Sequence, residues 1–202
     1  MAKKTDNGDM GAKLSLRRYF LRTYHADDPP RVIDCCSGSG RIWAQLRREF
    51  DVASYWPLDV KPQKGRLRVD STRVIAQRGW TENVVDVDTY GSPWKHWDAL
   101  LPCVMQPTTV FLTFGQLRTG TVGSLGDLPL RYMGLGKLAK RLPAGFHVKL
   151  RELVLPYAFR RAQDFRVSIV DARECSAGNA RYIGVRLNPA APHSSPAAES
   201  PQ

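Results

Sequence analysis

The 202-residue sequence predicts an α/β fold, with a mostly parallel, doubly wound sheet that carries helices on both faces. Short apolar runs typical of buried strands alternate along the chain with segments whose apolar residues recur at helical spacing. Several of these runs end in an aspartate, and the first is followed by a glycine-rich turn. Two neighbouring strand candidates close the pattern. We therefore expect a Rossmann-like, seven-stranded sheet that ends in a C-terminal antiparallel hairpin.

The first half of the chain alternates strand and helix candidates. The strand candidates are residues 31–35, 52–59, 67–70 and 83–88. The first helix is expected over residues 38–50, where Ile42, Trp43, Leu46 and Phe50 form an apolar face. Another helix is expected from Ser92, a favourable N-cap, with Pro93 at the first helical position. Its apolar face comprises Trp94, Trp97, Leu100, Leu101 and Val104.

The second half begins with a strongly β-favouring run at residues 108–114. Residues 115–136 hold six glycines and predict a mobile substrate loop, although an ordinary long loop is an alternative. In this loop Gln116, Arg118 and Arg131 could contact phosphate or base edges. Residues 137–142 and 150–163 predict helices, and residues 165–171 and 180–187 predict strands on either side of a turn-rich linker at 175–179.

Composition divides the chain into three parts. Residues 1–25 form a basic, partly helical N-terminal segment, residues 26–187 form one domain, and residues 188–202 form a Pro/Ala/Ser tail that we expect to be disordered. The run from Arg17 to Arg22 mixes cations with aromatics. It suits contact with a nucleic-acid backbone, and equally suits a helix that covers the sheet edge.

Charge and composition narrow the functional classes. Lys and Arg number 30 against 19 Asp and Glu, a net charge of +11 that permits a polyanionic partner such as nucleic acid. No stretch approaches the roughly 20 apolar residues of a membrane span, and the N-terminus lacks the apolar core of a secretory signal. A cytoplasmic protein is therefore expected. The four cysteines lack metal-ligand spacing, so no metal site is predicted.

The turn Asp34-Cys-Cys-Ser-Gly-Ser-Gly40 follows the first strand and predicts a ligand-binding loop. A dinucleotide site would need a third glycine where Trp43 stands, so that class is disfavoured. S-adenosylmethionine (SAM) has no phosphates, and its ribose requires an acidic residue at the end of the second strand. Asp59, followed by Val60, stands there, and Asp70 with Ser71 stands at the end of the third strand, near the expected adenine.

The segment Asp86-Val-Asp-Thr-Tyr-Gly-Ser-Pro93 resembles the Asp/Asn-Pro-Pro-Tyr/Phe motif that amine methyltransferases carry at the end of the fourth strand, and this resemblance implies an amine as the methyl acceptor. An exocyclic base amine is a weak nucleophile because its lone pair is delocalised into the ring. A carboxylate and a carbonyl that accept its N–H bonds favour a more nucleophilic nitrogen, and a stacked aromatic ring fixes the angle of the base. Asp88, the Thr89 carbonyl and Tyr90 could supply these three catalytic groups, with Pro93 nearby on the substrate side.

The order of these motifs over residues 30–187 resembles the class I SAM-dependent methyltransferases. The resemblance implies that the loop residues Asp34, Cys36, Ser37, Gly38 and Gly40 surround the methionine part of SAM. The segment from Asp86 to Pro93 is similar to the Asp-x-Asp-Pro-Phe/Tyr-Gly-Ser-Pro stretch of the tRNA guanine-26 N2-dimethyltransferases. Thr89 replaces the proline of that family, whose members also carry an additional C-terminal domain that we do not expect in this chain.

The sequence therefore predicts a SAM-dependent N-methyltransferase acting on an exocyclic amine of a nucleobase in RNA or DNA, with RNA favoured. The target base would have to leave its stack to reach the site. Two alternatives are a nucleic-acid-binding module that kept the fold and lost turnover, and a methyltransferase of small molecules or proteins.

Overall fold

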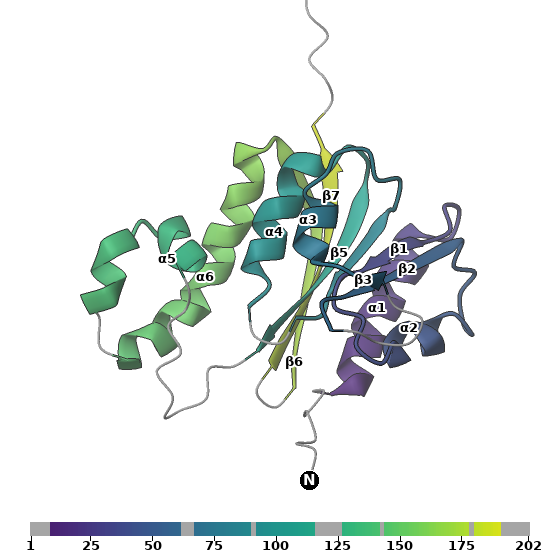
Figure 1. Cartoon of the computed structure of the whole chain (residues 1–202), viewed down its shortest axis with the longest axis horizontal. Helices are drawn as coiled ribbons and strands as arrows, with labels where there is room; N and C mark the ends of the chain where they lie inside the picture. Colours follow the sequence, from purple (N-terminus) through teal and green to yellow (C-terminus); the bar gives the residue numbers. More distant parts are fainter. Residues whose placement is uncertain are drawn as a thin grey trace, which may run out of the picture.

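A computed structural model describes residues 9–61, 67–89, 92–115, 127–141, 144–177 and 180–190 (Figure 1). The strands are β1 (Arg31–Asp34), β2 (Ser54–Asp59), β3 (Leu67–Arg68), β4 (Val84–Val87), β5 (Thr108–Gly115), β6 (Val167–Ala177) and β7 (Ala180–Pro189). The α-helices are α1 (Met10–Tyr24), α2 (Arg41–Leu46), α3 (Ser71–Ile75), α4 (Trp94–Leu100), α5 (Asp127–Tyr132) and α6 (Ala144–Asp164). Two 3₁₀ helices span Leu101–Cys103 and Gly136–Arg141.

The strands form one sheet in the order β3-β2-β1-β4-β5-β7-β6. Neighbouring strands from β3 to β5 are parallel, whereas β7 is antiparallel to both β5 and β6. The strand order reverses between β1 and β4, which lie side by side. In open α/β sheets, ligands bind at such a reversal, beyond the carboxyl ends of the strands. The mixed α/β class is confirmed, and the topology places the loops after β1, β2 and β4 at one edge.

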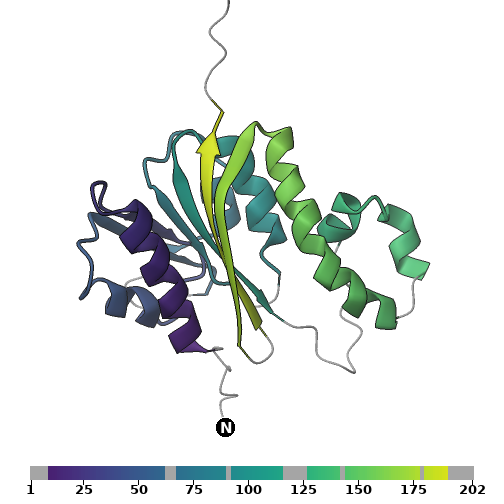
Figure 2. The same ribbon diagram turned by 180° about the vertical axis from the view of Figure 1, so that it is seen from behind.

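Helices cover both faces of the sheet (Figures 1 and 2). Successive side chains of a strand point to opposite faces, so a run of apolar residues makes both faces apolar. Val85 and Val87 of β4 join the core beneath α3, α4 and α6, while Val84 packs on the opposite side with α1 and α2. All five residues of the apolar face predicted for the helix after Pro93 are buried.

Helix α1 belongs to the second of these cores. Phe20 is fully buried and packs edge-on against Phe111 of β5, with ring centroids 5.8 Å apart. The helix contacts β6 and β7, and Asp9 caps its first turn by accepting a hydrogen bond from the Ala12 N–H. Of the two interpretations of the Arg17–Arg22 run, the packing therefore supports a helix that covers the sheet.

Several element boundaries differ from the predictions. The predicted linker at residues 175–179 is wrong at its start, since Cys175 to Ala177 pair with β7 as part of β6. The glycine-rich stretch contains α5, which packs against α6. Pro93, rather than Ser92, is the residue that precedes the first turn of α4. No helix in the described parts of the chain is both long and apolar enough to cross a membrane.

Candidate active site

The turn after β1 is anchored to the end of β2. The Ser37 N–H donates to the Leu58 carbonyl at 3.0 Å, and the Gly40 N–H donates to the Ser37 carbonyl at 2.7 Å. Gly38 and Gly40 adopt left-handed φ angles of +48° and +69°, which side chains with a Cβ rarely adopt. The Ser37 Oγ is buried and has no hydrogen-bond partner among the described residues. A buried hydroxyl in this state fits a loop whose partner is a ligand.

Asp59 closes this turn from the second strand. Its carboxylate accepts hydrogen bonds from the Gly38 N–H at 3.0 Å and from the Lys61 N–H at 2.8 Å. The side chain is buried at the carboxyl edge of the sheet, beside the glycine turn. The structure thus brings Asp59 and the turn together, whereas Val60 is 60% exposed and points away from the core.

The predicted adenine-side pair is built around α3. Asp70 is the N-cap of this helix. One of its carboxylate oxygens accepts a hydrogen bond from the Thr72 N–H at 3.0 Å and so stabilises the first turn of α3. The Ser71 hydroxyl is buried and lies 2.9 Å from Nε2 of His96, on α4. Burial lowers the pKa of His96, which favours a neutral ring beside Ser71.

Asp34 ends β1 beneath the glycine turn. Burial raises the pKa of its carboxyl well above the usual range, and the nearby Asp86 carboxylate raises it further. The Tyr55 hydroxyl donates to Asp34 Oδ2 at 2.8 Å and opposes that rise. Asp34 is therefore a buried group at the end of β1, hydrogen-bonded to Tyr55 of β2.

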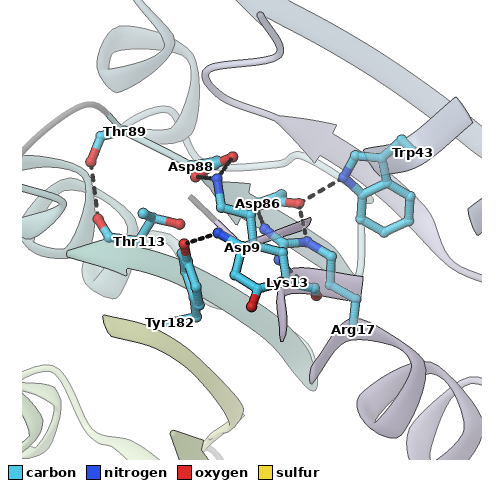
Figure 3. Close-up of polar contacts among 9 residues, drawn as sticks. All are labelled: Asp9, Lys13, Arg17, Trp43, Asp86, Asp88, Thr89, Thr113 and Tyr182. Carbon is cyan, nitrogen blue, oxygen red and sulfur yellow. Dashed lines mark hydrogen bonds and ion pairs between the residues drawn. The ribbon is translucent and has the colours of Figure 1, made fainter. Parts of the chain in front are cut away.

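The first aspartate of the Asp-x-Asp motif is a buried counter-ion (Figure 3). Asp86 accepts two hydrogen bonds from the Arg17 guanidinium, at 2.6 and 2.7 Å, and one from the Trp43 indole N–H at 2.7 Å. Both side chains of the ion pair are only 1% exposed. Burial alone would lower the pKa of Arg17, but the Asp86 carboxylate outweighs it and the pKa is raised. This pair fixes α1 on the sheet directly below the motif.

The second aspartate, Asp88, lies just beyond the end of β4 and faces Lys13 of α1 (Figure 3). The Lys13 ammonium donates to both carboxylate oxygens, at 2.7 and 2.6 Å, and lies 5.3 Å from the centre of the Tyr182 ring. The Tyr182 hydroxyl in turn accepts a hydrogen bond from the Asp9 N–H. Asp88 retains 19% side-chain exposure, so it is accessible at the rim of the site.

The sequence did not predict that Lys13, Arg17 and Trp43 contact the two aspartates of the motif. Four residues of an α-helix rise about 6 Å, and two residues of a strand rise about 6.6 Å. Lys13 and Arg17 therefore match the spacing of Asp88 and Asp86, with the helix running against the strand. This i, i+4 cation pair opposite an Asp-x-Asp pair is the pattern that could have identified them.

The predicted substrate residues are distributed differently. The Thr89 hydroxyl donates to the Thr113 carbonyl at 3.3 Å, which ties the motif to β5. Pro93 is buried at the start of α4, and Arg131 is exposed on α5. Tyr90, Gln116 and Arg118 lie outside the described residues.

The cysteine beside the site does not carry a thiolate. Burial raises the pKa of the Cys36 thiol to about 12, and it raises the pKa of Cys35 well above its usual range. Both thiols are therefore protonated at neutral pH, which disfavours attack by a cysteine nucleophile. In the described residues, no three His, Cys, Asp or Glu side chains come together in a group suited to a metal ion.

Comparison with solved structures identifies the fold. Trm1 from Pyrococcus horikoshii, in complex with S-adenosyl-L-methionine, matches 94% of this chain with a TM-score of 0.59 and 16% identity. The chain has a methyltransferase fold. It covers 59% of the length of that Trm1. In sequence, it matches no protein-family model and no curated protein.

Two further structures share this fold. TYW2 from M. jannaschii, in complex with AdoMet, matches 89% of this chain and is covered over 77% of its own length, with a TM-score of 0.56 and 7% identity. The plantazolicin methyltransferase BamL, in complex with a substrate analogue and SAH, matches 89% of the chain and is covered over 85%, with a TM-score of 0.53 and 8% identity.

Proposed function

We propose that this protein is a SAM-dependent methyltransferase that modifies an exocyclic amine of a nucleobase in a nucleic acid, with RNA favoured over DNA. The observation that carries the proposal is the shared edge of the sheet. The glycine turn after β1, Asp59 after β2 and Asp88 after β4 all lie at the carboxyl ends of neighbouring parallel strands. Ligands of open α/β sheets bind at this edge, so a cofactor and an amine could meet there.

The residues present fit SAM. The unpartnered Ser37 hydroxyl and the Gly38–Gly40 turn suit its methionine part, and the buried Asp59 carboxylate suits the two ribose hydroxyls. Ser71, held by His96, suits the adenine side together with Asp70. When bound, SAM supplies an activated methyl group, so the protein's task is to bind, orient and accept hydrogen bonds.

Asp88 would act on the amine. One N–H of the amine would donate to the Asp88 carboxylate and the other to the Thr89 carbonyl, which favours a nucleophilic nitrogen. Tyr90 would stack on the base. Lys13 would act as a positioning residue, because its two hydrogen bonds fix the orientation of the Asp88 carboxylate and each oxygen keeps a lone pair for the amine.

One observation favours a second candidate. The Lys13 ammonium donates to both oxygens of Asp88 and balances the charge of the carboxylate. A carboxylate neutralised in this way would also suit a nucleic-acid-binding module that no longer turns over. Calorimetry with SAM separates the two functions: measurable binding supports the methyltransferase, and no binding at millimolar SAM supports the module.

Labelling with tritiated SAM tests the proposed reaction. Total RNA, DNA and protein pools are incubated with the wild type, with Asp88→Asn and with the surface variant Asp164→Asn as a matched control. We expect label in RNA that is lost in Asp88→Asn and kept in Asp164→Asn. Label in protein alone would support a protein methyltransferase instead, and label that persists in Asp88→Asn would contradict the role of Asp88.

A further inference from the structure

Helices α1 and α2 together present a face rich in arginine, beside the candidate site. The face consists of Arg18 and Arg22 from α1 and of Arg41, Arg47 and Arg48 from α2 and the turn that follows it. All of them except the half-buried Arg18 are exposed. The two helices contact each other, and Glu49, the partner of Arg18, lines one cavity with Arg41 and Arg48, so arginines of both helices lie on one surface. We call this surface the arginine face.

Few carboxylates neutralise the arginine face. Glu49 accepts a bidentate pair of hydrogen bonds from Arg18, both at 2.7 Å. These bonds lower the pKa of Glu49, and the charge of the nearby Arg22 lowers it slightly further. The exposed Asp51 follows shortly after in the chain. Five cations thus stand against two carboxylates, and the surface keeps an excess of positive charge.

The exposed side of α2 is hollowed between two of these arginines. Arg41 and Arg48 flank a cavity of about 470 Å³ that is otherwise lined by Ala44, Gln45 and Glu49. Ala44 contributes only a small side chain to this lining, and the Gln45 side chain hydrogen-bonds to Glu49. Arg47 is held nearby, 5.4 Å from the centre of the Tyr55 ring. Planar guanidinium groups are suited to phosphate, because they can donate two parallel N–H hydrogen bonds to its oxygens.

The arginine face adjoins the catalytic edge. Arg41 directly follows Gly40 of the glycine turn, and α1 carries Lys13 and Arg17 to the two aspartates of the motif. A strand of nucleic acid on α1 and α2 would therefore run past the edge where Asp88 lies. The groove between α6 and β6, which Arg160 and Arg166 line, lies on the opposite face of the sheet from α1 and α2, because α6 covers one face and α1 and α2 cover the other (Figures 1 and 2).

We propose that the arginine face binds the sugar–phosphate backbone of the nucleic acid whose base enters the site. This inference rests on the proposed function, because it takes the polyanion to be the substrate. A surface that carries five arginines against two carboxylates is complementary in charge to the repeated phosphates of a nucleic-acid backbone. Acidic proteins and anionic membranes are competing partners that the experiment must separate.

Fluorescence anisotropy with a labelled RNA stem-loop tests the proposal. We expect Arg41→Gln/Arg48→Gln to weaken RNA binding about tenfold or more near 100 mM salt. The slope of log K against log salt should also fall by about 1 to 2, one unit for each phosphate that the variant no longer neutralises. Arg160→Gln/Arg166→Gln removes the same charge from the far groove and should change affinity less than about twofold. An equal weakening of RNA binding in the two double variants would overturn the proposal.

Two further measurements, the binding of other polyanions and SAM calorimetry, separate a failure of the arginine face from a failure of the methyltransferase function. Wild type that binds poly-glutamate or anionic vesicles as tightly as RNA would show a general polyanion surface and overturn the assignment to nucleic acid. SAM calorimetry on the same proteins should give the wild-type affinity for Arg41→Gln/Arg48→Gln. If the wild type binds no SAM and the double variant still fails to bind RNA, the arginine face stands while the methyltransferase function fails. If SAM binds and RNA does not, the arginine face is wrong and the cofactor assignment stands.

Discussion

Lys13 of α1 and Asp88 of the motif after β4 form a two-fold hydrogen-bonded ion pair, although 75 residues separate them in the chain. The lysine side chain is 7% exposed and the aspartate 19%, so the pair lies at the boundary between core and site. A helix at the N-terminus thereby sets the orientation of a carboxylate proposed to act on the substrate.

Replacing Lys13 tests this positioning role. In Lys13→Met, Asp88 loses both hydrogen bonds, and we expect the methylation rate at saturating SAM to fall about tenfold to a hundredfold. The SAM dissociation constant should not change, because Lys13 contacts none of the residues assigned to SAM. Lys13→Arg should recover part of the rate.

A control is needed because Asp88→Ala leaves the Lys13 ammonium without its carboxylate partner. The double variant Lys13→Met/Asp88→Ala removes both charges and should regain thermal stability relative to Asp88→Ala. If it also regained methylation, Asp88 would be a structural partner of Lys13 and not a group that acts on the amine.

The Arg17–Asp86 pair should matter for stability more than any surface ion pair. Arg17→Met leaves the Asp86 carboxylate buried with only the Trp43 N–H, and we expect a loss of about 3–5 kcal/mol in the free energy of unfolding. Arg17→Met/Asp86→Leu removes both charges and should recover much of it. Arg18→Met, one residue on, breaks the exposed pair with Glu49 and should change stability far less. Urea unfolding of the four proteins checks the order, and equal losses for Arg17→Met and Arg18→Met would contradict it.

The sequence predicted the parts of the site that follow strands and missed those that come from a distant helix. Short apolar runs located β1, β2 and β4, and the ends of these runs located Asp34, Asp59 and Asp88. Lys13 and Arg17 look like solvated helix charges in local sequence, and only the docking of α1 on β6 and β7 buries them. Pairing with β7 likewise keeps Cys175 to Ala177 in a strand despite their turn-like composition.

Gly184 of β7 should tolerate no side chain, because it faces Phe20. A Cβ at this position would lie 2.8 Å from Phe20 Cδ2 and still closer to Cε2. Phe20 is fully buried against Phe111 and cannot withdraw freely, so we expect Gly184→Ala to destabilise the fold by about 1–3 kcal/mol. Thermal unfolding measures this. Gly184→Ala in a Phe20→Leu background, where the ring is gone, should cost much less, and an equal cost in both backgrounds would refute the proposed clash.

Asp59 should control cofactor affinity. Asp59→Asn removes the negative charge and replaces one of the two oxygens that accept hydrogen bonds from the Gly38 and Lys61 N–H groups. We therefore expect SAM affinity to fall about tenfold or more in calorimetry. Asp70→Ser keeps an N-cap for α3 and should reduce affinity only slightly. If Asp70→Ser proved as damaging as Asp59→Asn, the ribose contact could not be assigned to Asp59.

His25 should make stability depend on pH. Burial and, second, the positive charge of Arg186 lower the pKa of His25 from an ordinary 6.5 to about 4. The ring is neutral at pH 7: Nδ1 lies 3.2 Å from the Asp28 carbonyl, to which it can only donate, so Nε2 accepts from the Thr109 hydroxyl at 2.9 Å. In the unfolded chain the same ring takes up a proton below about pH 6.5.

The unfolded state therefore binds more protons than the folded state between about pH 6.5 and 4, and stability is lost as pH falls through this range. The loss due to His25 should reach about 2 kcal/mol at pH 5. The raised pKa of Asp34 acts in the opposite direction, since that carboxyl favours the folded state at low pH. The comparison of wild type with His25→Gln cancels this contribution. Urea unfolding at pH 7 and pH 5 should show a smaller loss for His25→Gln than for the wild type, and parallel losses would show that His25 already carries a proton in the folded protein.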